Sequence, residues 1–169
     1  MNMHATPPVT GTPVNDTRAL RDAFSRFATG VTVVTTMTPA GPVGMTVNSF
    51  SSVSLEPPLC LWSIEGTSTR YHEFAGATQT AIHVLAHDQK ALCLAFAERP
   101  DAFDLSSWRQ GANGLPLIEG CLARFECQRF AAHEAGDHTI LIDRIVAAEM
   151  HGGEPLIFNQ GDFGRFAAS

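Results

Sequence analysis

Short polar side chains are concentrated between Gly44 and Ser54, where the sequence reads GMTVNSFSSVS. Hydroxyl and amide groups of this size let the backbone approach a planar polar ligand and bond to its ring edge and phosphate, without adding bulk or net charge. If the segment is extended, alternation directs Thr46, Asn48 and Ser52 to one face and Val47, Ser49, Ser51 and Val53 to the other. The segment is therefore a candidate ligand site, and the alternative is an edge strand with one solvent-exposed face.

A second candidate is the triplet Gly136-Asp137-His138, which precedes a long β-branched and aliphatic run. Glycine and aspartate are typical of tight turns. Taken alone, the triplet is best interpreted as a turn in which His138 begins the next strand.

Metal-binding and other common catalytic motifs are not found. His133 and His138 flank Glu134 but stand five residues apart across Gly136, whereas the zinc motif HExxH needs a spacing of four on one helical face. His83 and His87 have that spacing but span a predicted strand-to-helix boundary. We also find no GxGxxG, no Walker loop and no GxSxG. We therefore expect no metal site.

Composition restricts the class of protein further. The chain has 169 residues, which is close to one domain, and 44% are hydrophobic against 17% charged. Its formal net charge is −6 with no run of Lys or Arg, so we expect no nucleic-acid partner. No apolar stretch is long enough to cross a bilayer, and the N-terminus lacks the pattern of a signal peptide. We expect a cytoplasmic protein whose four cysteines form neither disulfides nor a zinc site.

The predicted elements are mostly strands. Residues 1–15 are rich in Pro and Thr and predict a flexible N-terminal tail, whereas residues 16–169 predict one folded domain. Helical spacing predicts helices at 17–30, 71–75 and 87–98, and residues 99–116 predict a loop. The runs that predict strands lie at 31–36, 45–55, 59–65, 79–86, 121–134, 138–151 and 155–163. This order favours a closed or split antiparallel barrel over a doubly wound sheet.

Several of these segments together resemble the flavin reductase-like family of split-barrel proteins. The resemblance is carried by FATGVTVVTT, GMTVNSFSSVSLEPPLCLWSI, HVLAHDQKALCLAFA, the Trp108–Pro116 region and AGDHTILIDRIV, in order from about Leu20 to Phe166. It implies a mainly β protein with flanking helices, built as a six-stranded antiparallel split β-barrel. It also implies a homodimer, FMN or FAD, NADH or NADPH as hydride donor, and a partner monooxygenase that receives reduced flavin.

The resemblance also implies positions for the flavin. The isoalloxazine ring and ribityl chain would lie against Thr46, Val47, Asn48 and Ser49, with the phosphate near Ser51 and Ser52. Ser63, Thr67 and Ser68 would close the site. No lysine stands in this stretch, so Arg70 is the candidate counter-charge for the phosphate.

In the family context, Gly136, Asp137 and His138 belong to the site. His138 would be the catalytic residue, placing the nicotinamide by donating a hydrogen bond to its amide or by stacking on its ring. Phe163 would help to cover the site. The alternative is that Phe163 is an ordinary core residue. The predicted function is an NAD(P)H-dependent flavin reductase. The alternatives are a non-catalytic flavin-binding module on the same barrel and a split-barrel oxidase acting on a phosphorylated vitamin.

Overall fold

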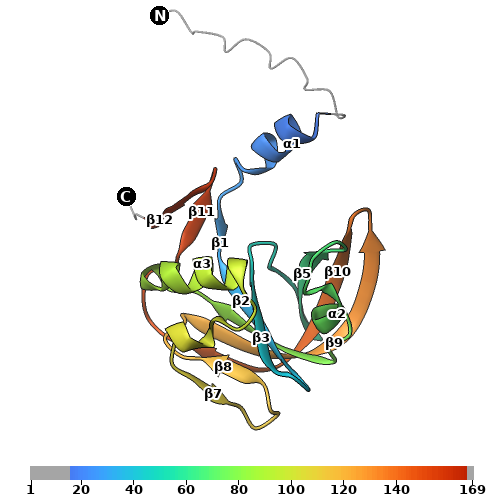
Figure 1. Cartoon of the computed structure of the whole chain (residues 1–169), viewed down its shortest axis with the longest axis vertical. Coiled ribbons are helices and arrows are strands. Elements are labelled where there is room, and N and C mark those ends of the chain that lie inside the picture. The colour runs from blue at the N-terminus through green and yellow to red at the C-terminus, as the bar shows by residue number, and fades with distance from the viewer. Residues whose placement is uncertain (1–15, 167–169) are drawn as a thin grey trace, which may run out of the picture.

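The computed structural model describes residues 16–166, which form a strongly curved antiparallel sheet with short helices beside it (Figure 1). The predicted tail at 1–15 and the last three residues lie outside the described part. The helices are α1 (Thr17–Phe24), α2 (Tyr71–Ala75) and α3 (Lys90–Glu98), with 3-10 turns η1 (His87–Gln89) and η2 (Ala102–Leu105). The strands are β1 (Thr29–Gly30), β2 (Thr32–Thr38), β3 (Gly41–Val47), β4 (Ser51–Leu55), β5 (Pro58–Glu65), β6 (Gln79–Val84), β7 (Trp108–Gln110), β8 (Pro116–Ile118), β9 (Ala123–Ala135), β10 (His138–Met150), β11 (Ile157–Asn159) and β12 (Asp162–Gly164).

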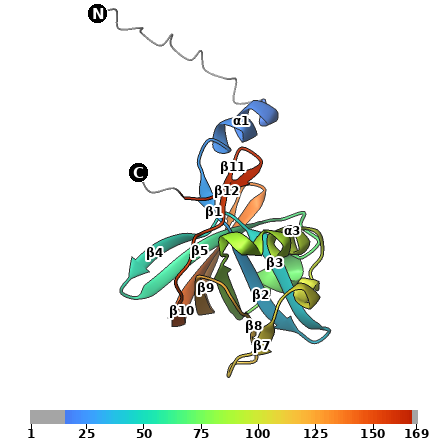
Figure 2. The ribbon, with the colours of Figure 1, turned by 90° about the vertical axis from the view of Figure 1, so that its left-hand side faces the viewer.

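The main sheet has seven strands in the order β3-β2-β6-β9-β10-β5-β4, and every pairing is antiparallel. Its two edge strands, β3 and β4, are consecutive in the chain and are joined only by residues 48–50. A link of this length spans at most about 15 Å, so the sheet must roll until its edges approach each other. Figure 2 shows the resulting curvature. The mainly β class with flanking helices is confirmed, but the sheet has seven strands rather than six and its edges are not paired by backbone hydrogen bonds within residues 16–166.

Large apolar side chains fill the inside of the rolled sheet. Trp62 and Phe74 are both fully buried and meet edge to face, with ring centroids 5.6 Å apart. The same cluster contains Val34, Val47, Cys60, Ile64, Ile82, Cys127 and Leu141. The strand residues of this cluster come from six of the seven strands, so the cluster holds the sheet in its curved form.

A second core cluster packs α3 against β2 and the loops around it. Phe96 lies at its centre, fully buried and edge to face with Phe103 at 5.0 Å. Gly44 on β3 faces the Phe96 ring so closely that a Cβ atom at position 44 would overlap it. Glycine at this position therefore allows α3 to lie directly on β3.

A buried polar network links four strands inside the rolled sheet. Asp143 on β10 is fully buried and accepts hydrogen bonds from Trp62 Nε1 (2.9 Å) and Thr80 Oγ1 (3.2 Å). Arg129 on β9 completes it as an ion pair, with Nε 2.6 Å from Asp143 Oδ1, and donates a further bond from Nη2 to the carbonyl of Phe74 in α2 (3.3 Å). Because both oxygens of the carboxylate are bonded, the charge is compensated where no water reaches it.

His83 on β6 is a second buried polar side chain, and its tautomer follows from its partners. Nδ1 donates to the carbonyl of Val33 (3.0 Å), and Nε2 accepts from the backbone N–H of Ile118 (3.1 Å). A neutral ring satisfies both bonds, whereas a proton on Nε2 would break the second. Burial, with a smaller contribution from the charge of Arg124, lowers the pKa of His83 to about 4.

This pKa makes the stability of the protein depend on pH in the acidic range. Because unfolded histidine takes up a proton near pH 6.5 and folded His83 only near pH 4, the unfolded state binds more protons between these values. Stability from this group is fully present above pH 6.5 and is lost as the pH falls towards 4, by about 3 kcal/mol in total. Urea unfolding at a series of pH values should show this loss in the wild type and a much smaller loss in His83→Gln. Equal slopes in the two proteins would contradict this role for His83.

The structure corrects three element predictions. The run at 45–55 is not one strand, because it breaks at residues 48–50 and its halves lie at opposite edges of the sheet. The first helix ends at Phe24, with Ser25 as its C-cap, so it is shorter than the predicted 17–30, and Gly30 belongs to β1. Asp16 is the N-cap of this helix, since its Oδ1 accepts from the N–H groups of Arg18 and Ala19. The predicted loop at 99–116 contains η2 and β7.

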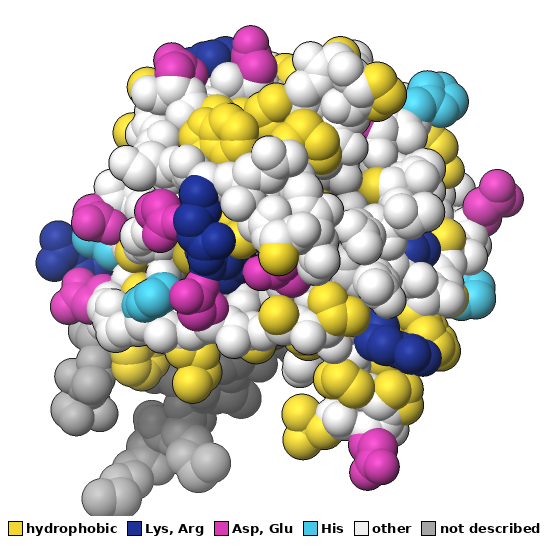
Figure 3. Space-filling model, turned by 90° about the horizontal axis from the view of Figure 1, so that it is seen from below, with side chains coloured by type: hydrophobic (Ala, Val, Ile, Leu, Met, Phe, Trp, Pro, Cys, Tyr) yellow, Lys and Arg dark blue, Asp and Glu magenta, His cyan; other side chains and the backbone are white. Residues whose placement is uncertain are grey.

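The surface of the described part is mixed in charge. On the face seen from below, Lys and Arg side chains are interspersed with acidic and hydrophobic ones (Figure 3). Within residues 16–166, no helix combines the length and apolar character that crossing a membrane requires. All four cysteines are buried and free, and no cluster of metal-ligating side chains is found in the same range.

Candidate functional site

A cavity of about 250 Å³ opens where β3 ends, beside the ends of β5 and the start of β10. It is lined by Met45, Thr46, Val47, Asn48, Ser49, Ser63, Ile64, Glu65, Ser68 and His138. Seven of these ten residues belong to the set predicted from the sequence: Thr46, Val47, Asn48, Ser49, Ser63, Ser68 and His138. Segments almost a hundred residues apart in the chain therefore meet at one place.

Ser49, in the link between the two edge strands, is held to β5 by two hydrogen bonds. Its Oγ accepts from the backbone N–H of Ser63 (2.9 Å) and donates to the carbonyl of the same residue (3.3 Å). The hydroxyl proton is therefore used within the protein, and Ser49 contributes one remaining lone pair to the cavity. Its main role is to hold the cavity wall in place, which leaves Asn48 exposed beside it.

Thr46 fixes the opposite wall to α3. Its Oγ1 donates to the carbonyl of Cys93 at 2.6 Å, so this hydroxyl can only accept from a ligand. Val47 and Ile64, both buried, supply the apolar floor. The cavity thus combines a fixed apolar base with polar side chains around its edge.

The turn between β9 and β10 places His138 at the rim. Gly136 adopts a left-handed conformation with φ +68°, which a glycine adopts without strain, and this confirms the predicted tight turn. Asp137 Oδ1 lies 2.7 Å from His138 Nδ1, and this hydrogen bond holds the pKa of Asp137 below its usual range. When Nδ1 carries the proton, Nε2 of the neutral ring accepts a hydrogen bond rather than donating one. The imidazole is half-buried and its free nitrogen is available to a ligand.

Glu65 is the acidic group of the site, and the sequence did not single it out. It is the last residue of β5 and lies opposite His138 in the antiparallel pairing of β5 with β10. The following Gly66 donates from its backbone N–H to the carbonyl of Asp137 at 2.8 Å, which ties the two turns together. Met45 and Ile64 were also missed. The signal for Glu65 was its place at the end of a strand, directly before the turn that holds Ser68.

The structure does not bring the remaining predicted residues into this cavity. Ser51 and Ser52 are exposed on β4, and Thr67 is exposed in the turn after β5. Gly136 and Asp137 lie behind His138 and act on the cavity only through it. Phe163 packs against Phe158 at 5.2 Å and under Lys90 Nζ at 5.1 Å, in the core around α3.

Arg70, the candidate counter-charge for the phosphate, does not line the cavity. Its side chain is nearly buried, and its guanidinium donates to the carbonyls of Phe96 and Ala97 at the C-terminal end of α3. Burial lowers the pKa of this guanidinium. A cation at this end of a helix balances the partial negative charge of the last carbonyls, so Arg70 is placed as a helix anchor rather than as a phosphate ligand.

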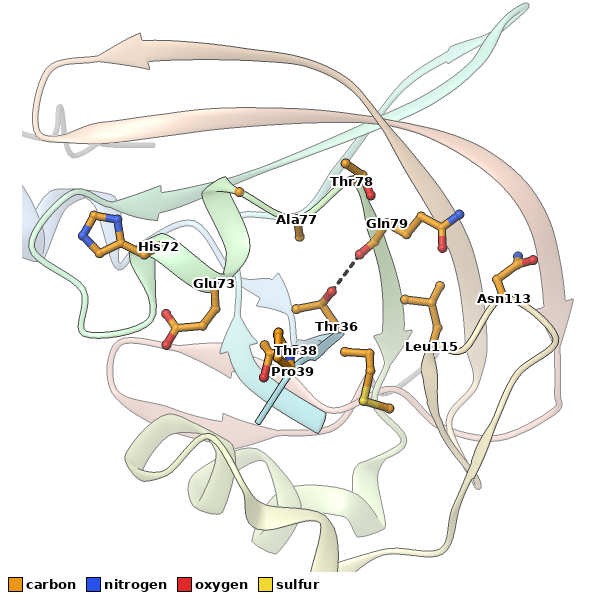
Figure 4. A pocket seen from close by; sticks show the side chains of 12 residues that line it. Thr36, Thr38, Pro39, His72, Glu73, Ala77, Thr78, Gln79, Asn113 and Leu115 are labelled. Atoms are coloured by element: carbon orange, nitrogen blue, oxygen red, sulfur yellow. Dashed lines mark hydrogen bonds between the residues drawn. The ribbon is translucent and has the colours of Figure 1, made fainter. Parts of the chain in front are cut away.

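A larger cavity of about 620 Å³ borders α2 and contains none of the predicted site residues. Figure 4 shows its lining, in which Thr36 Oγ1 donates to the carbonyl of Gln79 at 2.9 Å. His72 and Glu73 of α2 border it together with Asn113 and Leu115. Size alone would favour this cavity, but the smaller one holds the fixed apolar floor, the polar rim and the oriented imidazole that a reaction requires.

The smaller cavity fits the ring system of a flavin better than its phosphate. Val47 and Ile64 offer apolar contact to a flat face, and Asn48, Ser63 and Ser68 offer neutral hydrogen-bonding groups to a polar edge. No Lys or Arg is among the residues that line it. The residues present therefore fit an uncharged heteroaromatic ring, and a phosphate would extend beyond this lining.

Comparison with known proteins identifies the family to which the chain belongs. The family model of the flavin reductase like domain matches residues 24–167, and the chain belongs to this family. The resemblance seen in the sequence is therefore confirmed.

Individual relatives agree with this assignment. The chain is 53% identical over 152 residues to the FMN reductase (NADH) SmoA of Agrobacterium fabrum, covering 90% of this chain and 87% of that protein. It is 50% identical over 135 residues to the reductase component of a flavin-dependent trigonelline monooxygenase of Acinetobacter baylyi, covering 78% of this chain but only 43% of that relative. The solved structure of the NADH:FAD oxidoreductase SgcE6 of Streptomyces globisporus has a TM-score of 0.89 at 37% identity, covering 98% of this chain and 96% of the other.

Proposed function

We propose that this protein is an NADH-dependent flavin reductase that supplies reduced FMN or FAD to a partner monooxygenase. The observation that carries the proposal is the meeting of Asn48, Ser63, Ser68 and His138 around one cavity in a chain of the flavin reductase-like family. The 53% identity to an NADH-dependent FMN reductase supports NADH over NADPH, and relatives that are reductase components of monooxygenases support the partner. A cytoplasmic location, predicted from the sequence, agrees with this role.

Different residues of the cavity would bind the flavin and position the nicotinamide. Asn48, Ser63 and Ser68 would bond to the edge of the flavin ring, and Val47 and Ile64 would contact its face. His138, oriented by Asp137, would accept a hydrogen bond at Nε2 from the carboxamide of the nicotinamide and so hold the donor carbon over the ring. A bound flavin supplies the electron-accepting chemistry, and these residues position the two reactants.

A direct assay tests this function. Purified protein is mixed with NADH and either FMN or FAD, and the loss of nicotinamide absorbance is followed against the reaction without protein. We expect catalysed oxidation of NADH that requires added flavin. A protein that binds flavin but accelerates the loss of neither NADH nor NADPH would be the non-catalytic flavin-binding module instead.

We propose that the rolled sheet is a split barrel of the family type and that two chains form a homodimer. Two apolar surfaces support the dimer. No side chain of α1 is buried, and Phe24 at its end is 68% exposed, as is Phe27 just after the helix at 79%. Phe130 on β9 and Val146 on β10 are about half exposed. Apolar groups left uncovered in this way favour association with a second copy.

Charge placed on the dimer surfaces should separate the chains. We expect the wild type to sediment at twice the mass of one chain, and Phe24→Glu or Phe130→Glu to shift it towards the monomer, because a buried carboxylate without a partner is costly. Leu94→Glu on α3, which is 45% exposed, is the matched control and should remain dimeric. A monomeric wild type, or equal effects of all three variants, would contradict the proposal.

A further inference from the structure

The rim of the flavin cavity is acidic. Glu65 lines the cavity, and Asp137 lies behind the imidazole of His138. Within residues 16–166, no Lys, Arg or His forms an ion pair with Glu65. The Asp137 carboxylate is bonded to His138 and also interacts with the positive charge of Arg21 of α1, and both contacts lower its pKa. Glu65 is thus the uncompensated charge of the cavity.

Flavin reduction changes the charge next to this carboxylate. NADH gives a hydride, which is two electrons and one proton, to the neutral oxidised flavin ring and leaves as NAD⁺, so the ring becomes an anion until it takes up a proton. A negative group facing the ring therefore acts differently on the two forms of the same ligand. The cavity holds no Lys or Arg among its lining residues to offset that difference.

We propose that Glu65 weakens the binding of reduced, anionic flavin relative to oxidised flavin and so promotes release of the product to its acceptor. This inference rests on the proposed function, because it requires the flavin ring to lie in the cavity that Glu65 lines. Glu65 acts here as a specificity-determining residue between two redox states. By linkage, the same carboxylate must lower the midpoint potential of the bound flavin.

The expected effect of Glu65 on flavin binding depends on how exposed its carboxylate is. The carboxylate is exposed at the rim, so water and salt screen its charge, and the interaction with a charge several ångströms away is modest. We expect Glu65 to change the ratio of the two dissociation constants about three- to tenfold at low ionic strength. A tenfold ratio corresponds to about 30 mV for a two-electron couple.

The test is a pair of anaerobic titrations without nicotinamide, above neutral pH. The Kd of oxidised FMN and the Kd of chemically reduced FMN are measured for the wild type, Glu65→Gln, Glu65→Asp and Glu73→Gln. Glu73 is a matched control, because it is a carboxylate on α2 that borders the other cavity. We expect Glu65→Gln to lower the ratio Kd(reduced)/Kd(oxidised) about three- to tenfold while the oxidised Kd changes less than about twofold. Glu65→Asp should keep most of the ratio, and high salt should reduce the difference.

Two outcomes overturn the inference in different ways. If Glu65→Gln leaves the ratio at the wild-type value, or changes it no more than Glu73→Gln does, Glu65 does not discriminate between the redox states. The location of the site is tested separately with Asn48→Trp, whose indole should fill the cavity and weaken oxidised FMN about tenfold or more. If Asn48→Trp binds oxidised FMN as the wild type does, the flavin lies elsewhere, and both this inference and the site assignment fail.

Discussion

Replacing His138 with alanine should lower kcat/KM for NADH about 30-fold or more while the Kd of oxidised flavin changes less than about twofold. The reason is geometric. Asp137 holds Nδ1 at 2.7 Å and directs the ring, so that Nε2 is presented at the cavity rim where the nicotinamide would lie. Alanine removes the group that places the donor carbon but leaves the contacts of Asn48, Ser63 and Ser68 to the flavin. Steady-state kinetics with varied NADH, together with a flavin titration, measure both quantities.

The matched control is His133→Ala. His133 lies on β9 of the same hairpin, is exposed and does not line the cavity, so its loss should leave both constants near the wild-type values. Asp137→Asn should have an intermediate effect, because it weakens the bond that orients the ring without removing the ring. If His138→Ala turns over NADH as the wild type does, or if flavin affinity falls in parallel with turnover, His138 does not position the nicotinamide.

Replacing Asp143 with alanine should destabilise the protein by about 3–5 kcal/mol. The variant leaves the partly buried Arg129 without a counter-charge and removes the acceptor for Trp62 Nε1 and Thr80 Oγ1. Since these partners come from β5, β6 and β9, the loss should affect cooperative unfolding of the whole sheet rather than one strand. Urea unfolding followed by tryptophan fluorescence measures it.

Asp101→Ala provides the comparison for the buried pair. Asp101 also faces an arginine, Arg99, at 3.3 Å, but its side chain is 75% exposed, and such surface pairs contribute about 0–1 kcal/mol. In the double variant Asp143→Leu with Arg129→Met, much of the stability should return, because two apolar groups replace the charge that would otherwise stay unpaired. Similar losses for Asp143→Ala and Asp101→Ala would show that the buried network does not hold the sheet.

Local sequence signals predicted most elements well. The long runs at 121–134 and 138–151 are β9 and β10 within two residues at each end, because their β-branched and aliphatic pattern agrees with their partners. The turn at Gly136 followed from residue types alone. Short polar side chains on a strand indicated the ligand site at Thr46, Asn48 and Ser49, whereas Ser63, Ser68 and His138 were assigned to it from the family resemblance.

The missed features depend on contacts between distant segments. Alternation continues without interruption through residues 45–55, so only the closure of the sheet, fixed by Ser49 on Ser63, shows that two strands are present. Arg70 has the residue type of a phosphate ligand, but the carbonyls that it binds belong to a helix more than twenty residues away. Glu65 belongs to the candidate site because it lies opposite His138 in the pairing of β5 with β10. No local sequence pattern indicates this pairing.

The position of β10 has a consequence for synthesis of the chain on the ribosome. This strand lies between β9 and β5 and is the only connection by backbone pairing, within the described residues, between the hairpin β4–β5 and the rest of the main sheet. The nascent chain must therefore emerge to about residue 150 before its early hairpins can share one sheet. Until then the apolar residues of β5, Trp62 among them, cannot be buried in the finished core. The nascent chain is most prone to aggregation during that interval.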